Sequence, residues 1–219
     1  MSRRRLSVLI EAGSKRVFAC AVDWPGLARY GRTEAEAIDA LLAALPRYEA
    51  VAQAAGVAFP AGLDRDEVDV SERVEGNATT DFGAPGIVCE ADREAVTAAE
   101  ARRQAALVEA AWAVFGAVAK AAPEELRKGP RGGGRDRSKM VAHLEDSDRG
   151  YAGVIGIPGA SNASRSTEML RAEMLDLLRR PSDGSPLGGK RWPPRYAARR
   201  VAWHALDHAW EMEDRSTPG

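Results

Sequence analysis

Three histidines are the residues of this sequence that point most directly to chemistry, and two of them lie four positions apart. His204 and His208 fall in the stretch WHALDHAWEMEDR (203–215), which we predict to be helical. Side chains at positions i and i+4 of a helix project from one face, about 5–6 Å apart at Cβ, so both imidazoles can reach one ion. His143 lies in another predicted helix and can supply a third ligand if the two helices face each other. Three histidine ligands leave a coordination position open, which is typical of catalytic metal sites.

A histidine pair on an alanine-rich helix also has simpler explanations, because an isolated histidine is often a polar core residue or a surface residue. The neighbours of the pair add candidates for catalysis. Glu211 shares the ligand face and could bind the metal, orient a ligand, move a proton, or be a solvated charge near the helix end. Arg200 lies one turn before His204 and could bind a substrate carboxylate. Asp146 and Asp207 each follow a histidine by three residues and could accept a hydrogen bond from it.

The composition is that of a globular protein, with 45% hydrophobic residues, 29% charged residues and a net charge of −1 over 219 residues. This balance argues against binding to nucleic acid or to an anionic membrane surface. The N-terminus lacks the apolar run of a signal peptide, and no stretch is long and apolar enough to cross a bilayer. Two cysteines cannot form a disulfide framework, so we expect a cytoplasmic protein in which Cys20 is buried and not nucleophilic.

The first part of the chain, residues 1–58, predicts a small β-β-β-α unit. Leu6–Glu11 and Arg16–Val22 read as a hairpin, and Leu27–Tyr30 as a third strand after a Pro-Gly turn. Thr33 and Glu36 then have the spacing of a capping box, and apolar residues continue at helical spacing to residue 45.

The stretch VDWPGLARYGRTEAEAIDALLAAL, within residues 6–50, resembles the HicB-like antitoxin domain. The resemblance implies a unit that binds a protein partner, although a scaffold that only shapes turns explains the same residues. Such antitoxins usually carry a separate DNA-binding segment, which we do not find. Residues 59–92 are rich in acidic residues, glycine and proline, and we predict an acidic linker there, with at most a brief strand at residues 67–74.

Residues 93–219 predict four helices. Their expected spans are 93–121, from Asp136 or Ser138 toward Tyr151, from Ser166 to the residue before Pro181, and from near Pro194 onward. We therefore predict an α+β protein of two domains whose second domain is a four-helix bundle. The glycine-rich GPRGGGRDR (129–137) lacks the spacing of a phosphate-binding loop, but its arginines could form an anion-binding rim with Lys190 and Arg191. Trp203 and Trp210 are expected to pack in the core or at an interface.

KMVAHLEDSDRGY (139–151) and RRVAWHALDHAWEMEDR (199–215) resemble the second-helix and last-helix motifs of the DinB/YfiT-like superfamily, the maleylpyruvate-isomerase-like group. The resemblance spans most of residues 93–217. It implies a four-helix bundle that holds a divalent metal through His143, His204 and His208. The metal would be zinc, with nickel or iron as alternatives. It also implies transfer or isomerisation assisted by a low-molecular-weight thiol such as mycothiol or bacillithiol, acting on a small-molecule substrate.

Two alternatives remain open from the sequence. Metal-activated water attacking an ester or amide would make the same site a hydrolase. In the other alternative the protein is an interaction module, in which the HicB-like unit binds a protein partner, the helical part forms a homodimer, and the metal is structural or absent.

Overall fold

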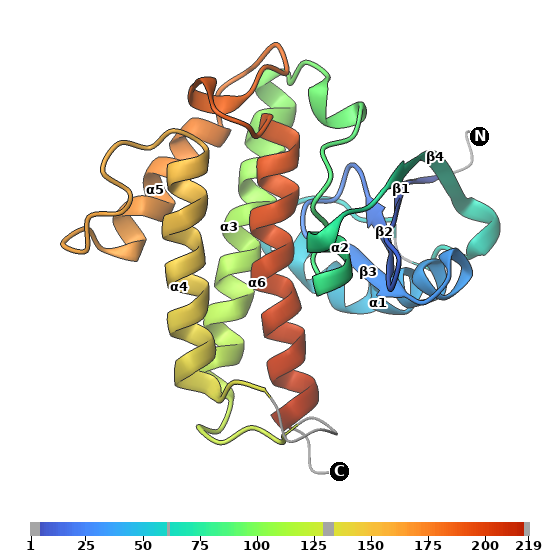
Figure 1. The fold of residues 1–219 in the computed structure, drawn as a ribbon, viewed down its shortest axis with the longest axis horizontal. Coiled ribbons are helices and arrows are strands. Elements are labelled where there is room, and N and C mark those ends of the chain that lie inside the picture. Colours follow the sequence, from blue (N-terminus) through green and yellow to red (C-terminus); the bar gives the residue numbers. More distant parts are fainter. Residues whose placement is uncertain (1–4, 61, 129–133, 217–219) are drawn as a thin grey trace.

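The computed structural model describes residues 5–60, 62–128 and 134–216. It has an α+β fold, in which a four-stranded N-terminal sheet is followed by a helical C-terminal region (Figure 1). This confirms the predicted class and the order of the two parts. No helix among the described residues combines the length and the apolar character needed to cross a membrane.

The predicted hairpin forms the centre of the sheet. β1 (Leu6–Ala12) and β2 (Val17–Ala21) pair antiparallel, and β3 (Ala28–Gly31) continues antiparallel from β2. The strand order is β3-β2-β1-β4, in which β4 (Val68–Glu75) pairs parallel with β1. β4 lies where the brief strand at residues 67–74 was considered, so this part of the predicted linker, residues 59–92, belongs to the sheet.

α1 (Glu34–Ala54) covers one face of the sheet and begins as predicted, because the Thr33 hydroxyl accepts a hydrogen bond from the Glu36 amide. It runs past Pro46, where the apolar pattern suggested an earlier end. The helix continues because its last turns bury Tyr48 and Val51 in the core, and such burial outweighs the hydrogen bond that an internal proline removes.

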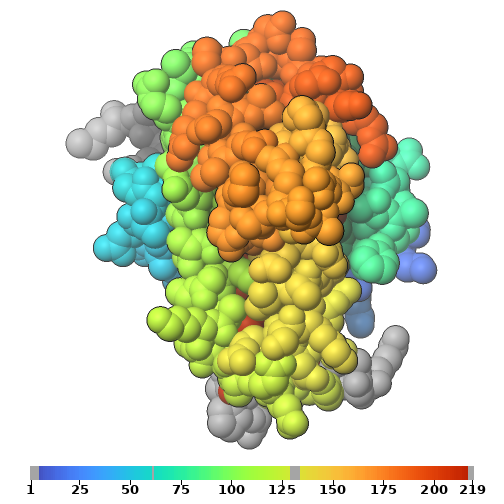
Figure 2. Space-filling model, turned by 90° about the vertical axis from the view of Figure 1, so that its left-hand side faces the viewer, coloured from blue at the N-terminus to red at the C-terminus, as the bar shows by residue number. Residues whose placement is uncertain are grey.

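Four long helices follow. They are α3 (Ala98–Ala121), α4 (Arg137–Val154), α5 (Thr167–Leu178) and α6 (Pro194–Ser216). α6 packs against α3 and α4, and α5 packs against α3 and α4. In the space-filling view from the side of α5, α4 and α5 cover most of α6 (Figure 2). The shorter elements are η1 (Arg65–Glu67), α2 (Ala78–Phe82), η2 (Ala91–Arg93) and η3 (Leu187–Gly189).

The sheet and the helical region share their core. One continuous cluster of buried side chains joins the inner face of β1, the inner face of α1 and the facing sides of α3 and α6. A second cluster lies on the other face of the sheet, where Phe18 meets Trp203 of α6 edge to face, with ring centroids 6.1 Å apart. α6 is therefore packed against both parts of the chain, and it carries two of the three histidines.

Candidate metal centre

The three histidines meet between α4 and α6. His143 projects from α4 and the other two from α6, and one ring nitrogen from each lies within 4.8 Å of the others. The Nε2 atoms of His204 and His208 are 3.0 Å apart. Nitrogen ligands of a tetrahedral zinc ion, bound at about 2.0–2.1 Å, lie about 3.3 Å from one another. The group fits such an ion after side-chain movements of about an ångström or less, well within rotamer flexibility.

The imidazoles of His143 and His204 are held in the neutral form that binds metals. Burial, together with the neighbouring charges of His208 and Arg200, lowers the pKa of His204 to about 2. The pKa of His143 is also lowered, first by burial and then by the nearby Arg135 guanidinium. Neither residue must therefore lose a proton to solvent near neutral pH before it accepts a cation.

Hydrogen bonds to the outer ring nitrogens fix two of the histidines. Glu211 Oε2 lies 3.2 Å from His208 Nδ1, and this contact is the main reason that the pKa of Glu211 is lowered. The ionised carboxylate makes Nδ1 of His208 the protonated nitrogen, which leaves Nε2 free to bind a metal. Tyr151 Oη lies 3.4 Å from His204 Nδ1, and a hydroxyl can donate to that nitrogen or accept from it. His204 can therefore carry its proton on Nδ1, which leaves Nε2 free to bind a metal, and still keep its hydrogen bond to Tyr151.

The two aspartates proposed as histidine partners take other roles. Among the described residues, no hydrogen bond joins Asp146 or Asp207 to an imidazole; Asp207 instead pairs with Arg29 of β3 at 3.0 Å. Sequence reasoning assigned no role to Tyr151. Its spacing was a usable signal, because His143, Ser147 and Tyr151 follow one another at intervals of four along α4 and all line the same cavity.

That cavity has a volume of about 330 Å³ and lies between the two parts of the chain. The helical region contributes all three histidines together with Arg135, Ser147, Tyr151, Arg200, Trp203 and Asp207. The opposite wall comes from α2 and the residues after it, namely Thr79, Phe82, Gly83 and Ala84. Phe82 is 87% exposed, so the wall presents an aromatic ring that the described residues leave largely uncovered. The cavity can therefore admit a small molecule next to the histidines.

Arginines give the cavity a positive character. Arg200 Nη1 lies 3.4 Å from the carbonyl oxygen of Pro85, and its guanidinium lies over the Trp203 ring at 4.9 Å from the centroid. Arg135 also lines the cavity, whereas Lys190 and Arg191, proposed for the same rim, do not. Residues 129–133 of the predicted loop lie outside the described residues. The one lining carboxylate among the described residues, Asp207, is already paired, so the arginines remain available to an anion.

The other predicted features take part in packing. Cys20 and Cys89 are buried free thiols, and burial is the main reason that the pKa of each is raised to about 12. Neither is a nucleophile near neutral pH. Trp203 and Trp210 are buried as expected, although Trp203 also faces the cavity and stacks beside His204.

Comparison with protein-family models, with curated proteins and with solved structures gives no match for this chain. The resemblances to the DinB/YfiT-like and HicB-like groups therefore stay predictions from short motifs. The chemistry of the site rests on the residues and distances above.

Proposed function

We propose that this protein is an enzyme that depends on a divalent metal held by His143, His204 and His208. The observation that carries the proposal is the convergence of three imidazoles from two helices at the side of a cavity of about 330 Å³. Nitrogen ligands of this kind suit zinc first, and nickel or iron as well.

The donor set favours a catalytic role for the metal over a structural one. Structural zinc sites are closed by four protein ligands, commonly cysteines and histidines. Here the cluster of possible ligands within the described residues contains three histidines and no fourth donor, and both cysteines lie in a separate buried cluster. An open position facing a cavity gives a small molecule access to the ion.

We propose a thiol-assisted transfer or isomerisation, with a thiol such as mycothiol or bacillithiol. A divalent ion held by the three histidines would lower the pKa of a thiol or water molecule bound to it. Glu211 and Tyr151 orient the histidines, and Arg200 receives an anionic group of the substrate. The proposal is supported by the resemblance of residues 139–151 and 199–215 to DinB-like four-helix bundles, and by the histidine positions on α4 and α6.

The N-terminal unit has the β-β-β-α order of a HicB-like domain, and we propose that relationship for β1–β3 and α1. We do not propose a free-standing interaction module. The segment that follows β4 forms a wall of the metal cavity, which favours a unit that helps to build the site.

The test is conjugation of mycothiol or bacillithiol to chlorodinitrobenzene by zinc-loaded protein at neutral pH. We expect acceleration by the wild type that a chelator abolishes and that zinc restores. H143A and H204A should fold, as judged by circular dichroism, and should lose at least about 100-fold in rate, as expected for removal of a catalytic metal. A rate that survives chelation or the H204A substitution contradicts the proposal. Hydrolysis of a nitrophenyl ester without thiol would instead identify the hydrolase alternative.

A further inference from the structure

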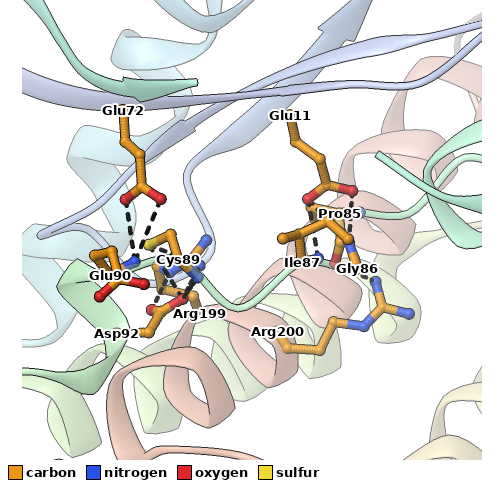
Figure 3. Close-up of polar contacts among 10 residues, drawn as sticks. All are labelled: Glu11, Glu72, Pro85, Gly86, Ile87, Cys89, Glu90, Asp92, Arg199 and Arg200. Carbon is orange, nitrogen blue, oxygen red and sulfur yellow. Dashed lines mark hydrogen bonds and ion pairs between the residues drawn. The ribbon is translucent and has the colours of Figure 1, made fainter. Parts of the chain in front are cut away.

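Residues 84–90, which we call the strap, lead from α2 to η2 and lie between the sheet and α6. Figure 3 shows the strap with carboxylates of the sheet reaching it from one side and arginines of α6 from the other. Its first residue, Ala84, lines the metal cavity. The contacts that fix the strap therefore also fix one wall of the metal cavity.

Glu11 of β1 holds the end of the strap that is nearest to the cavity. Its side chain is fully buried, yet the structure records no ion pair for it within the described part of the chain. Oε1 accepts a hydrogen bond from the Gly86 amide at 2.9 Å, and Oε2 accepts one from the Ile87 amide at 3.1 Å. The Thr80 hydroxyl of α2 donates a third hydrogen bond to Oε1. A buried carboxylate is costly without such donors, so these contacts fix the strap and the carboxylate together.

α2 is tied to the sheet at a second point. Asp81 accepts hydrogen bonds from the Ser14 hydroxyl at 2.5 Å and from the Lys15 amide at 2.7 Å, both in the turn between β1 and β2. Three of the four residues that form this wall, Phe82 to Ala84, lie between Asp81 and the strap amides that bind Glu11. This wall is therefore attached to β1 and to the turn that follows it.

The strap also contacts Arg200 directly, because the carbonyl oxygen of Pro85 accepts the hydrogen bond from its guanidinium. Pro85 immediately precedes Gly86, whose amide is bound to Glu11. At the far end of the strap, Glu72 accepts a hydrogen bond from the Glu90 amide at 3.1 Å, but neither residue lines the cavity. Two carboxylates of the sheet thus hold the strap, and one of them, Glu11, acts next to the site.

We propose that Glu11 is a positioning residue of the metal cavity. Through the Gly86, Ile87 and Thr80 contacts, its carboxylate holds the α2 wall against the histidines and keeps the Pro85 carbonyl under the Arg200 guanidinium. This inference rests on the proposed function for the role of the cavity. It assigns the N-terminal sheet a part in the reaction site, which the antitoxin likeness does not imply.

The test measures how fast phenylglyoxal modifies Arg200 in the full-length, metal-free protein, by mass spectrometry of peptides. We expect E11A to raise this rate about threefold or more, since it frees the strap and weakens the hydrogen bond that shields Arg200. E11Q should stay within about twofold of the wild type, because its amide oxygen still accepts from the strap amides and its NH2 group can donate to Thr80. E72A is the matched control and should also stay within about twofold. Arg180, which is exposed and outside the cavity, serves as the internal reference.

A second variant covers the case that E11A does not fold. T80V keeps the side-chain shape but removes the donor to Glu11 and the acceptor for the Asn77 amide, and it should raise Arg200 reactivity in the same direction by a smaller factor. Equal reactivity of Arg200 in the wild type and in the folded Glu11 or Thr80 variants overturns the inference. So does an increase in E72A as large as that in E11A, because the effect would then be a general loosening of the strap. A wild type that binds no metal would refute the proposed function and leave these outcomes unchanged, because the assay uses metal-free protein.

Discussion

The contact between Glu211 and His208 leads to a quantitative prediction for metal affinity. The carboxylate fixes the His208 tautomer that presents Nε2 to the site, over a distance of 3.2 Å. Removing such a partner of a metal-binding histidine typically weakens metal binding 10–100-fold. That range corresponds to about 1.4–2.8 kcal/mol of binding free energy.

Two features of the structure place Glu211→Gln at the lower end of this range. The Glu211 side chain is 37% exposed, so solvent screens part of its charge, and its other oxygen is bound to Arg215 at 2.8 Å. The glutamine keeps one acceptor oxygen that can still receive the His208 proton. We therefore expect about a tenfold loss of zinc affinity for E211Q and a loss nearer 100-fold for E211A, which leaves no acceptor.

The assay is competition for zinc against a chromophoric chelator at pH 7, with E213Q as the matched control. Glu213 lies two residues further along α6 and pairs with Arg47, away from the histidines. Its substitution should leave zinc affinity within about twofold of the wild type, as expected for an exposed charge outside the site. The reasoning about Glu211 is refuted if E211A binds zinc as tightly as the wild type, or if E213Q loses as much affinity as E211Q.

Three further predictions concern stability and thiol chemistry. D92A should lower the free energy of unfolding by about 3–5 kcal/mol in urea titrations, because it leaves the buried Arg199 without its carboxylate; a loss below about 1 kcal/mol would contradict this. The two buried thiols should not react with Ellman's reagent at pH 8 until the protein unfolds, and rapid labelling of native protein would contradict their burial. Burial raises the pKa of Asp148 to about 6 from 3.8, so its contribution to stability is fully present below pH 4 and is lost as the pH rises through 6. D148N should remove this part of the pH dependence of the free energy of unfolding. A variant with the same pH dependence as the wild type would contradict the role of Asp148.

The elements that the sequence predicted well are those fixed by local interactions. The hairpin turn, the Thr33 and Ser166 caps and the proline at the start of α6 act within a few residues, and the structure contains each of them. β4 depends instead on pairing with β1, in which Leu6 lies opposite Val68, more than sixty residues away. Half-buried and exposed residues alternate along β4, and many of them are acidic, so the composition resembled that of a linker.

The same distinction applies to the site. The spacing of His204 and His208 follows from the geometry of one helix, and Glu211 lies on the same face, so these neighbours could be predicted from the sequence. Asp207 was expected to bind a histidine, and its pairing with Arg29 could not be predicted because Arg29 comes from β3. The α2 wall and Glu11 were also missed, since their role depends on how the sheet packs against α6. The tertiary contacts that build the cavity join residues far apart in the chain, and one sequence does not reveal them.

The most direct test of the metal centre is zinc stoichiometry combined with zinc K-edge X-ray absorption on the wild type and on H143A, H204A and H208A. We predict one zinc ion per wild-type chain, with three imidazole nitrogens at about 2.0–2.1 Å and at least one further, exchangeable ligand. Each substitution should remove one imidazole from the spectrum or abolish binding. A wild-type protein that binds no divalent metal at micromolar concentrations, or zinc whose ligands do not change in any of the three variants, would contradict the account.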